Sequence, residues 1–149
     1  MLTSIGVLWV PTGLVAADHV TLSTLSGNGT STDPYVITDV HELQAMEQDL
    51  DAHYTLGNDI DASVTSEWAS GSGFTPIGSS TTAFTGSLTG RGYHITNLSI
   101  NRPGDGEVGL FGRVGIGGNL TGVWLLDVNV TGDSSTGSLV GQSEGTITE

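Results

Sequence analysis

Asp59 and Asp61 are the two side chains of this 149-residue sequence whose type and spacing best fit a catalytic or cation-binding role. In an extended strand, residues two apart project from the same face, so these carboxylates could act as acid and base on a sugar or hold a divalent cation such as Ca²⁺. The alternative is a turn, because Asp at the end of a strand commonly accepts hydrogen bonds from backbone amides. We favour the turn, and interpret Gly104-Asp105-Gly106 in the same way rather than as a calcium loop.

A zinc-protease site would need two histidines four residues apart on a helix. His41 and Glu42 begin such a pattern, but position 45 is Ala, so Glu42 is interpreted as a helix-capping residue. The spacing suggests no arrangement of Ser, His and an acidic residue, and the absence of cysteine removes thiolate metal sites and disulfides. The sequence predicts a protein that is not an enzyme, with no catalytic residue, metal site or cofactor, Ca²⁺ remaining the alternative.

Two tryptophans lie in contexts that predict exposure. Trp68 stands in the polar run TSEWASGSG, and Trp124 has outward parity in its strand. An exposed aromatic ring could stack on a sugar, so Trp124 joins Asp59 and Asp61 as a candidate contact for a cation or a sugar. The alternative for an outward Trp is cover by a loop or a neighbouring chain.

Asn-x-Ser/Thr sequons are sites where an exported protein could carry glycans. Four occur, at Asn28, Asn97, Asn119 and Asn129. Asn97 is predicted to occupy a bend, which makes it a poor acceptor. The glycosylation candidates are therefore Asn28, Asn119 and Asn129.

The composition favours an all-β fold. Glycine contributes 23 residues, and the hydrophobic fraction of 36% is below the usual value of about 45–50%. Glycine supplies the positive φ angles of tight turns, so many short strands are expected.

The charge balance is strongly acidic, with 16 Asp and Glu against 3 Arg and a formal net charge of −13. Such a surface repels phosphate backbones and anionic lipids, so it disfavours nucleic acid as a partner. Repulsion among these charges opposes compaction at low salt and is screened at high salt. A halophilic source is the hypothesis that follows, and an ordinary acidic surface protein is the alternative.

One helix is predicted, over about residues 40–50. Asp39 can cap it, with Glu42 three residues later as in a capping box, and Leu43, Met46 and Leu50 share one face. That face is expected to cover the N-terminal end of a stack of strands, which would otherwise expose its apolar cross-section.

From His53 onward the pattern is one of short strands, and the inward face switches between Ile95 and Leu98. A straight strand cannot switch faces and keep one face buried, whereas a bend at Asn97 can, since Asn tolerates the left-handed region. Gly122 is expected to make the same bend in the next repeat.

Similar segments recur at intervals of about 25 to 29 residues, a range typical of stacked repeats. We align Ile95 with Leu120 and Ile147, and Leu110 with Leu139. The alternative fold is a β-sandwich built of hairpins. Such a fold would need several Asn-Gly or Asp-Gly turns, and these dipeptides occur at only two places in the sequence. We therefore predict an all-β, right-handed parallel β-helix (β-solenoid) with one short N-terminal capping helix.

A string of motifs over residues 27–149 resembles the GLUG-motif β-helix regions of bacterial and archaeal surface proteins. Such regions occur in adhesins and before the catalytic part of immunoglobulin-A-protease-type metallopeptidases. The resemblance implies an extracellular scaffold and fixes no ligand. The motifs that carry it are Gly27-Asn-Gly-Thr-x-x-Asp33-Pro-Tyr35, Tyr54-x-Leu-x-x-Asp59-Ile-Asp61, Phe74-x-Pro-Ile-Gly78, Phe84-x-Gly-x-Leu-x-Gly90, His94-Ile-x-Asn-Leu98, Gly109-Leu-Phe-Gly112 and Gly137-Ser-Leu-Val-Gly141-x-x-x-Gly145-Thr-Ile147.

The domain prediction has three parts. Residues 1–17 are apolar and are predicted to be a signal peptide or an N-terminal apolar segment. Residues 18–34 are predicted to be a linker. Residues 35–149 are predicted to form a β-helix module that continues beyond 149. The expected location is secreted or on the cell surface, without a transmembrane span. Expected partners are other domains of a longer protein, a polysaccharide or cell surface, or a second copy docked at an uncapped end.

Two classes of function follow. The leading one is a non-catalytic structural or adhesive surface module, from a halophile on the charge argument. The alternative is a carbohydrate-active β-helix enzyme or a polysaccharide-binding module, which would need carboxylates gathered on one solvent-facing sheet. Convergence of Asp59, Asp61 and Asp127 would support this alternative.

Overall fold

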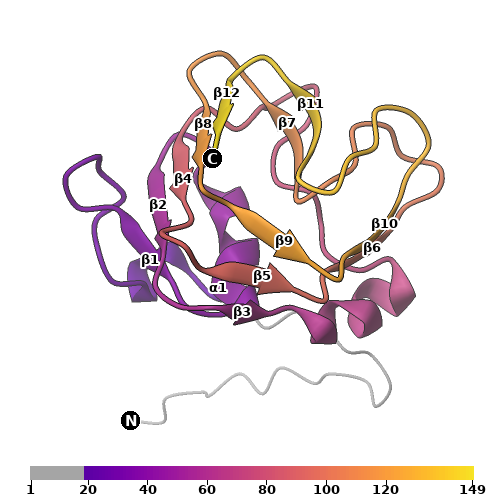
Figure 1. Cartoon of the computed structure of the whole chain (residues 1–149), viewed down its shortest axis with the longest axis horizontal. Helices are drawn as coiled ribbons and strands as arrows, with labels where there is room; N and C mark the ends of the chain where they lie inside the picture. The colour runs from indigo at the N-terminus through magenta and orange to yellow at the C-terminus, as the bar shows by residue number, and fades with distance from the viewer. Residues whose placement is uncertain (1–18) are drawn as a thin grey trace, which may run out of the picture.

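The protein is described by a computed structural model that covers residues 19–149. Its largest sheet has five parallel strands in the order β1-β2-β4-β8-β12 (Figure 1). These strands are β1 (Tyr35–Ile37), β2 (His53–Leu56), β4 (Ser87–Thr89), β8 (Asn119–Thr121) and β12 (Thr146–Thr148).

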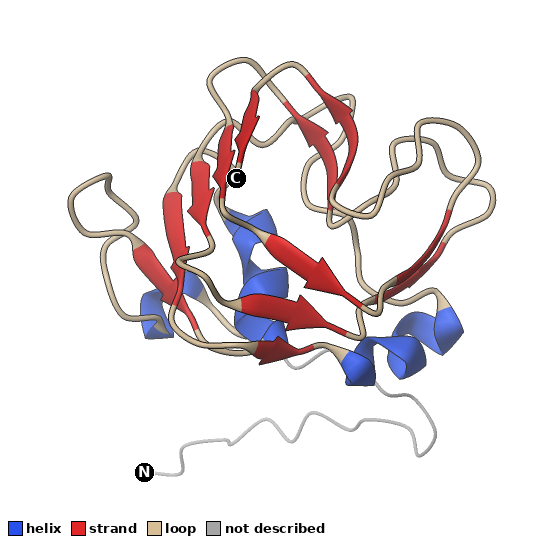
Figure 2. Ribbon diagram, viewed as in Figure 1, coloured by secondary structure: helices blue, strands red, loops and turns tan. Residues whose placement is uncertain are grey.

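Three smaller sheets form other sides of the coils. Their strands are β3 (Ile60–Asp61), β5 (His94–Thr96) and β9 (Trp124–Leu126) in one sheet, β6 (Ser99–Asn101) and β10 (Asn129–Thr131) in the second, and β7 (Phe111–Val114) and β11 (Val140–Ser143) in the third. Every strand pair is parallel, and the chain passes through the sheets in turn for about three turns of a β-solenoid (Figure 2). The predicted all-β parallel β-helix with a short capping helix is confirmed.

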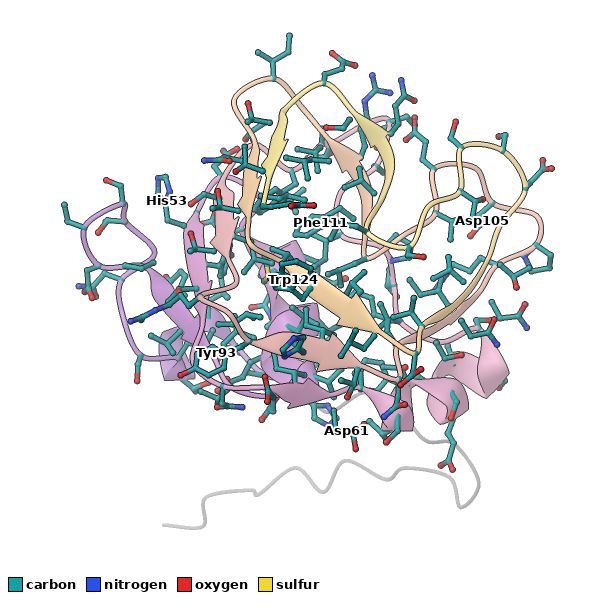
Figure 3. All side chains as sticks on the ribbon, viewed as in Figure 1. His53, Asp61, Tyr93, Asp105, Phe111 and Trp124 are labelled. Carbon is teal, nitrogen blue, oxygen red and sulfur yellow. The ribbon has the colours of Figure 1, made fainter. Side chains whose placement is uncertain are left out.

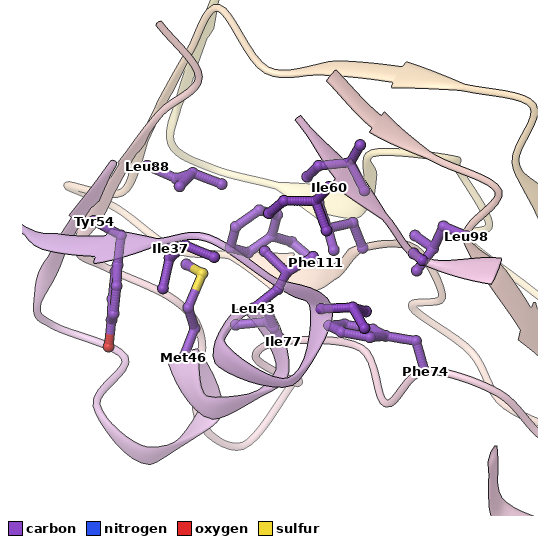
Figure 4. Packing of buried hydrophobic residues seen from close by; sticks show 14 of the residues in the cluster. Ile37, Leu43, Met46, Tyr54, Ile60, Phe74, Ile77, Leu88, Leu98 and Phe111 are labelled. Carbon is purple, nitrogen blue, oxygen red and sulfur yellow. The ribbon is translucent and has the colours of Figure 1, made fainter. Parts of the chain in front are cut away.

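The core is a set of apolar columns inside the coils. Tyr54 lies opposite Leu88, and Leu88 lies opposite Leu120, so each coil places an apolar side chain over the one before it. The rings of Phe84 and Phe111 pack on each other with their centroids 4.8 Å apart, and Figure 4 shows Phe111 among the buried side chains of the core. Burial of these apolar columns and rings favours the stacking of the coils.

Asn97 makes the predicted bend, with φ at 59°, and Ile95 and Leu98 on its two sides are both buried. Gly122 also has the predicted left-handed conformation, with φ at 57°. The predicted switch of the inward face at both corners is therefore confirmed. The left-handed backbone turns the strand direction, so side chains of opposite parity can both point inward.

The predicted alignment of Ile95 with Leu120 is wrong. Ile95 pairs with Leu125, and Leu120 pairs with Leu88 on one side and with Ile147 on the other. The corner equivalent to Asn97 is therefore not Gly122, since Asn97 follows β5 and Gly122 follows β8. The predicted alignment of Leu120 with Ile147 is correct.

The predicted helix is present but shorter than expected. It consists of α1 (Val40–Ala45) and one further turn, η2 (Met46–Gln48). The Asp39 side chain caps it by accepting hydrogen bonds from the backbone amides of His41 and Glu42. Leu43 and Met46 are fully buried on its inner face (Figure 4).

Two 3₁₀ helices were not predicted, η1 (Leu22–Thr24) and η3 (Ser63–Gly71). Trp68 lies in η3 and is only 2% exposed, so its predicted exposure is wrong. Its ring packs between His41, at a centroid distance of 5.1 Å, and Phe74, at 6.3 Å. The left-handed residues Ala69 and Ser70 fold the polar run back, which places the ring inside.

In the segment 18–34, expected to be a linker, the described residues 19–34 are partly packed on the module. Val20 and Leu22 contact the core, Leu25 is buried, and Ser26 forms a bridge with Val36 of β1. The apolar segment 1–17, expected to be a signal peptide, lies outside the described residues.

Candidate functional site

Asp59 and Asp61 flank the buried Ile60 and both reach the next coil. One Asp59 carboxylate oxygen accepts a hydrogen bond from the His94 backbone amide at 2.8 Å and lies 3.4 Å from His94 Nδ1. Asp61 Oδ1 accepts hydrogen bonds from Asn97 Nδ2 at 3.1 Å and from the Ser63 amide at 3.0 Å. Both carboxylates are therefore used to join β3 to the coil that contains β5.

The same hydrogen bonds lower the pKa of Asp61 below its ordinary value. The Asn97 side chain is the main cause, followed by the backbone and side chain of Ser63. A lowered pKa favours the ionised form, so this carboxylate stabilises the fold above its unfolded pKa and loses that contribution as the pH falls through the folded value. Asp61 therefore acts as a stabiliser of the corner at neutral pH.

Asp59, Asp61 and Asp127 do not gather at one point. Asp61 and Leu126 both pair with Thr96 from opposite sides, so β5 separates Asp61 from the corner at Asp127. Two strand spacings amount to about 9.6 Å. Within residues 19–149, no group of three or more His, Asp or Glu side chains is arranged to hold a metal ion.

Gly141-Gln142-Ser143-Glu144-Gly145 matches the Gly-x-Ser-x-Gly pattern of nucleophile-elbow hydrolases. That motif requires a strand, a sharp turn and a helix. Here Ser143 ends β11, its hydroxyl accepts a hydrogen bond from the Gly145 amide at 3.3 Å, and the next element is strand β12. The neighbouring Glu144 is paired with Arg113. The structural context of a hydrolase is missing from this motif.

Arg113 is a structural residue that sequence reasoning missed. Its guanidinium donates to Glu107 at 3.0 Å and also to Glu144 on the following coil. These bonds, chiefly the one to Glu144, raise the pKa of Arg113 above its ordinary value. Because Glu144 is far away in sequence, no local pattern could have revealed this pair.

Trp124 is 46% exposed, which confirms its predicted exposure (Figure 3). It pairs with His94 across the sheet, and His94 contacts Asp59, which directly precedes β3. Trp124 also borders a cavity of about 320 Å³ at the end of the solenoid that carries β12. Further residues that line this cavity are Leu120, Val123, Leu139 and Ile147.

A second hollow, of about 230 Å³, lies beside α1. His41, Gln44 and Trp68 line it. His41 Nδ1 and Trp68 Nε1 are buried without a hydrogen-bond partner among the described residues. Gln44 instead binds both the amide and the carbonyl of Thr75, which fixes the helix to the loop before β4.

The sequon residues occupy different environments. Asn28 is exposed, but its amide donates to Asp33 at 2.6 Å. Asn97 is at the left-handed corner and bound to Asp61. Asn119 and Asn129 are exposed at outward positions of β8 and β10. Glycosylation at Asn28, Asn119 and Asn129 stays a prediction.

The chain is similar to short regions of two long proteins. Over 127 residues, or 81% of this chain, it is 42% identical to a protein named Halomucin from Haloquadratum walsbyi, of which the match covers 1%. Over 126 residues, again 81% of this chain, it is 32% identical to a "Putative Gly-rich membrane protein" of Evansella cellulosilytica, of which the match covers 14%. The chain thus spans only a small part of the curated relatives it matches.

No family model and no solved structure match this chain, so the resemblance to the GLUG motif has no support from these comparisons. Across residues 19–149, every helix is too short or too polar to cross a membrane. What is established is a parallel β-solenoid with relatives named as Halomucin and as a Gly-rich membrane protein.

Proposed function

We propose that this chain is a non-catalytic structural segment of a cell-surface protein adapted to high salt. The observation that carries the proposal is the 42% identity to Halomucin over 81% of the chain, in a sequence with a net charge of −13. The name of the second relative as a membrane protein agrees with a location at the cell envelope.

The side chains that could have done chemistry support a structural role instead. Asp59 and Asp61 bind the neighbouring coil, and Arg113 connects Glu107 to Glu144 one coil further on. Parallel strands in continuous register resist bending, because each coil is bonded to the next through several sheets. A stiff spacer or platform is the function that this arrangement serves.

The surface location predicts that the segment is accessible on intact cells. An antibody raised against the recombinant 149-residue chain should label intact cells of the source organism about as strongly as permeabilised cells. Fluorescence microscopy or flow cytometry would measure this, with an antibody to a cytosolic protein as the control for intactness. Labelling that requires permeabilisation would contradict the proposal.

Adaptation to high salt predicts a gain in stability with NaCl. Between about 0.1 M and 1 M the Debye length falls from about 10 Å to 3 Å, so repulsion among the surface carboxylates weakens. We expect the midpoint of thermal unfolding to rise by at least about 3 °C, equivalent to roughly 1 kcal/mol for a chain of this size. Circular dichroism would measure the midpoint.

A matched variant separates charge screening from general effects of salt. Glu67, Asp127 and Asp133 are exposed, and their side chains make no hydrogen bond or ion pair within residues 19–149. The triple variant Glu67→Gln, Asp127→Asn, Asp133→Asn should therefore be more stable at low salt and gain less from NaCl. An equal gain in both proteins would assign the effect to something other than these charges.

A further inference from the structure

The two ends of the solenoid differ in how they are covered. At the end that carries β1, Leu43 and Met46 of the capping helix are fully buried, and Ser26 forms a bridge with Val36 at the strand edge. At the other end, β9, β10, β11 and β12 are each the last strand of a sheet. Within residues 19–149, each of them pairs with another strand on one side only. Figure 1 shows these strands in orange and yellow.

Burial differs sharply between neighbouring coils at this second end. Leu88 and Leu120 are fully buried, whereas Ile147 in the same column is 47% exposed. Ile95 and Ile100 are likewise buried, while their partners in the last coil are only partly covered. We call this surface the C-terminal face; it consists of Val123, Leu125, Val130, Leu139, Val140 and Ile147.

The partly covered side chains of this face lie at inward positions of the coil. Leu125 continues the column of Ile60 and Ile95, and Val140 lies opposite Phe111. An apolar residue at an outward position would need no cover. These residues instead point into the interior of the coil, which apolar side chains fill in every earlier coil. The cavity of about 320 Å³ on this face is lined by the same kinds of side chain.

We propose that the C-terminal face receives a further parallel β-coil of the same repeat, supplied in cis by the polypeptide that follows in a longer protein. Such a coil would extend all four sheets by strand addition and place apolar side chains over Leu125, Val130 and Val140. The relatives, which are far longer than the matched region, are consistent with such an extension.

A second copy of this chain fits the face less well. Within the described residues, the capping helix closes the opposite end, so a copy could offer only its own C-terminal face. That contact would run strands antiparallel and bring Asp127, Asp133 and Glu144 of both copies together. A coil in cis keeps the parallel register already present between β8 and β12.

The test extends the chain with its own repeat. Thr148 pairs with Thr121, so residues 1–148 followed by a second copy of residues 122–149 continue the register. We expect amide hydrogen exchange in the original β9 to β12 to slow at least about tenfold, because unpaired edge strands become internal. The unfolding midpoint should rise, and binding of the apolar dye ANS should fall.

A matched extension carries Leu125→Asp, Val130→Asp and Val140→Asp within the added copy, and it should give none of this protection. Unchanged exchange in the original strands with the unmodified extension would overturn the proposal. It would also be overturned if the 149-residue chain formed a dimer in analytical ultracentrifugation with β9 to β12 protected, since a second copy would then be the occupant.

Discussion

Replacing Phe111 by Ala is expected to lower the free energy of unfolding by about 3–5 kcal/mol, the usual cost of emptying a fully buried aromatic site. Phe111 is completely buried at the start of β7 (Figure 4). Its ring packs on that of Phe84. The rigid backbones of adjacent coils leave little room for collapse around the cavity, which places the effect at the upper end of the range. Chemical denaturation at molar NaCl would measure it.

Ile116→Ala is the matched control, because Ile116 is 79% exposed in the turn after the same strand. It should change stability by less than about 0.5 kcal/mol. Phe111→Leu keeps part of the volume and should be less damaging than Phe111→Ala, so it remains measurable if the Ala variant does not fold. Equal effects of Phe111→Ala and Ile116→Ala would contradict the central position of the Phe84–Phe111 pair.

The fold was predictable because its determinants are local. The change of inward face between Ile95 and Leu98 can be read from the sequence, and so can the tolerance of Asn97 and Gly122 for left-handed backbone. The cap at Asp39 is also local, since its partners are two and three residues away. These short-range features determine the path of one coil independently of the coils that stack on it.

The register between coils was harder to predict, because the coils differ in length. Thr121 and Thr148, which face each other, are 27 residues apart, whereas Asp59 and His94 are 35 apart. A fixed period therefore aligns the wrong strands, and it assigned Ile95 to the column of Leu120. Loops of variable length account for the difference in coil length, and these loops have no apolar pattern from which their length could be predicted.

In the candidate site, too, local features could be predicted from the sequence, whereas contacts between coils could not. The sequence predicts that Asp59 and Asp61 accept hydrogen bonds from backbone amides, but the partners His94 and Asn97 on the next coil depend on the register. The polar neighbours of Trp68 predict exposure, although its side chain is buried. Its burial results from contacts with His41 and Phe74, and only the folded chain brings His41 to it.

The tight stacking of coils also explains why particular glycines are needed. Gly86 and Gly90 border β4, and both are buried. A Cβ on Gly86 would lie 1.9 Å from the Ala52 carbonyl oxygen in one neighbouring coil, and a Cβ on Gly90 would lie 1.8 Å from the Gly122 carbonyl oxygen in the other. Neither backbone can move without disturbing a strand, so β4 can contact both neighbours only if these positions lack side chains.

Gly86→Ala is therefore expected to destabilise the protein by about 3 kcal/mol or more, at or above the upper end of the usual cost of overpacking, because the clash is with backbone rather than a flexible side chain. Gly104→Ala is the matched control, since a Cβ there meets nothing within 4 Å and the residue has no positive φ. It should be neutral or slightly stabilising, because Ala restricts the unfolded chain. Denaturant unfolding of both variants at molar NaCl would compare them. If Gly86→Ala unfolded at the same denaturant concentration as Gly104→Ala, the coils at β4 would have to be further apart than this structure places them.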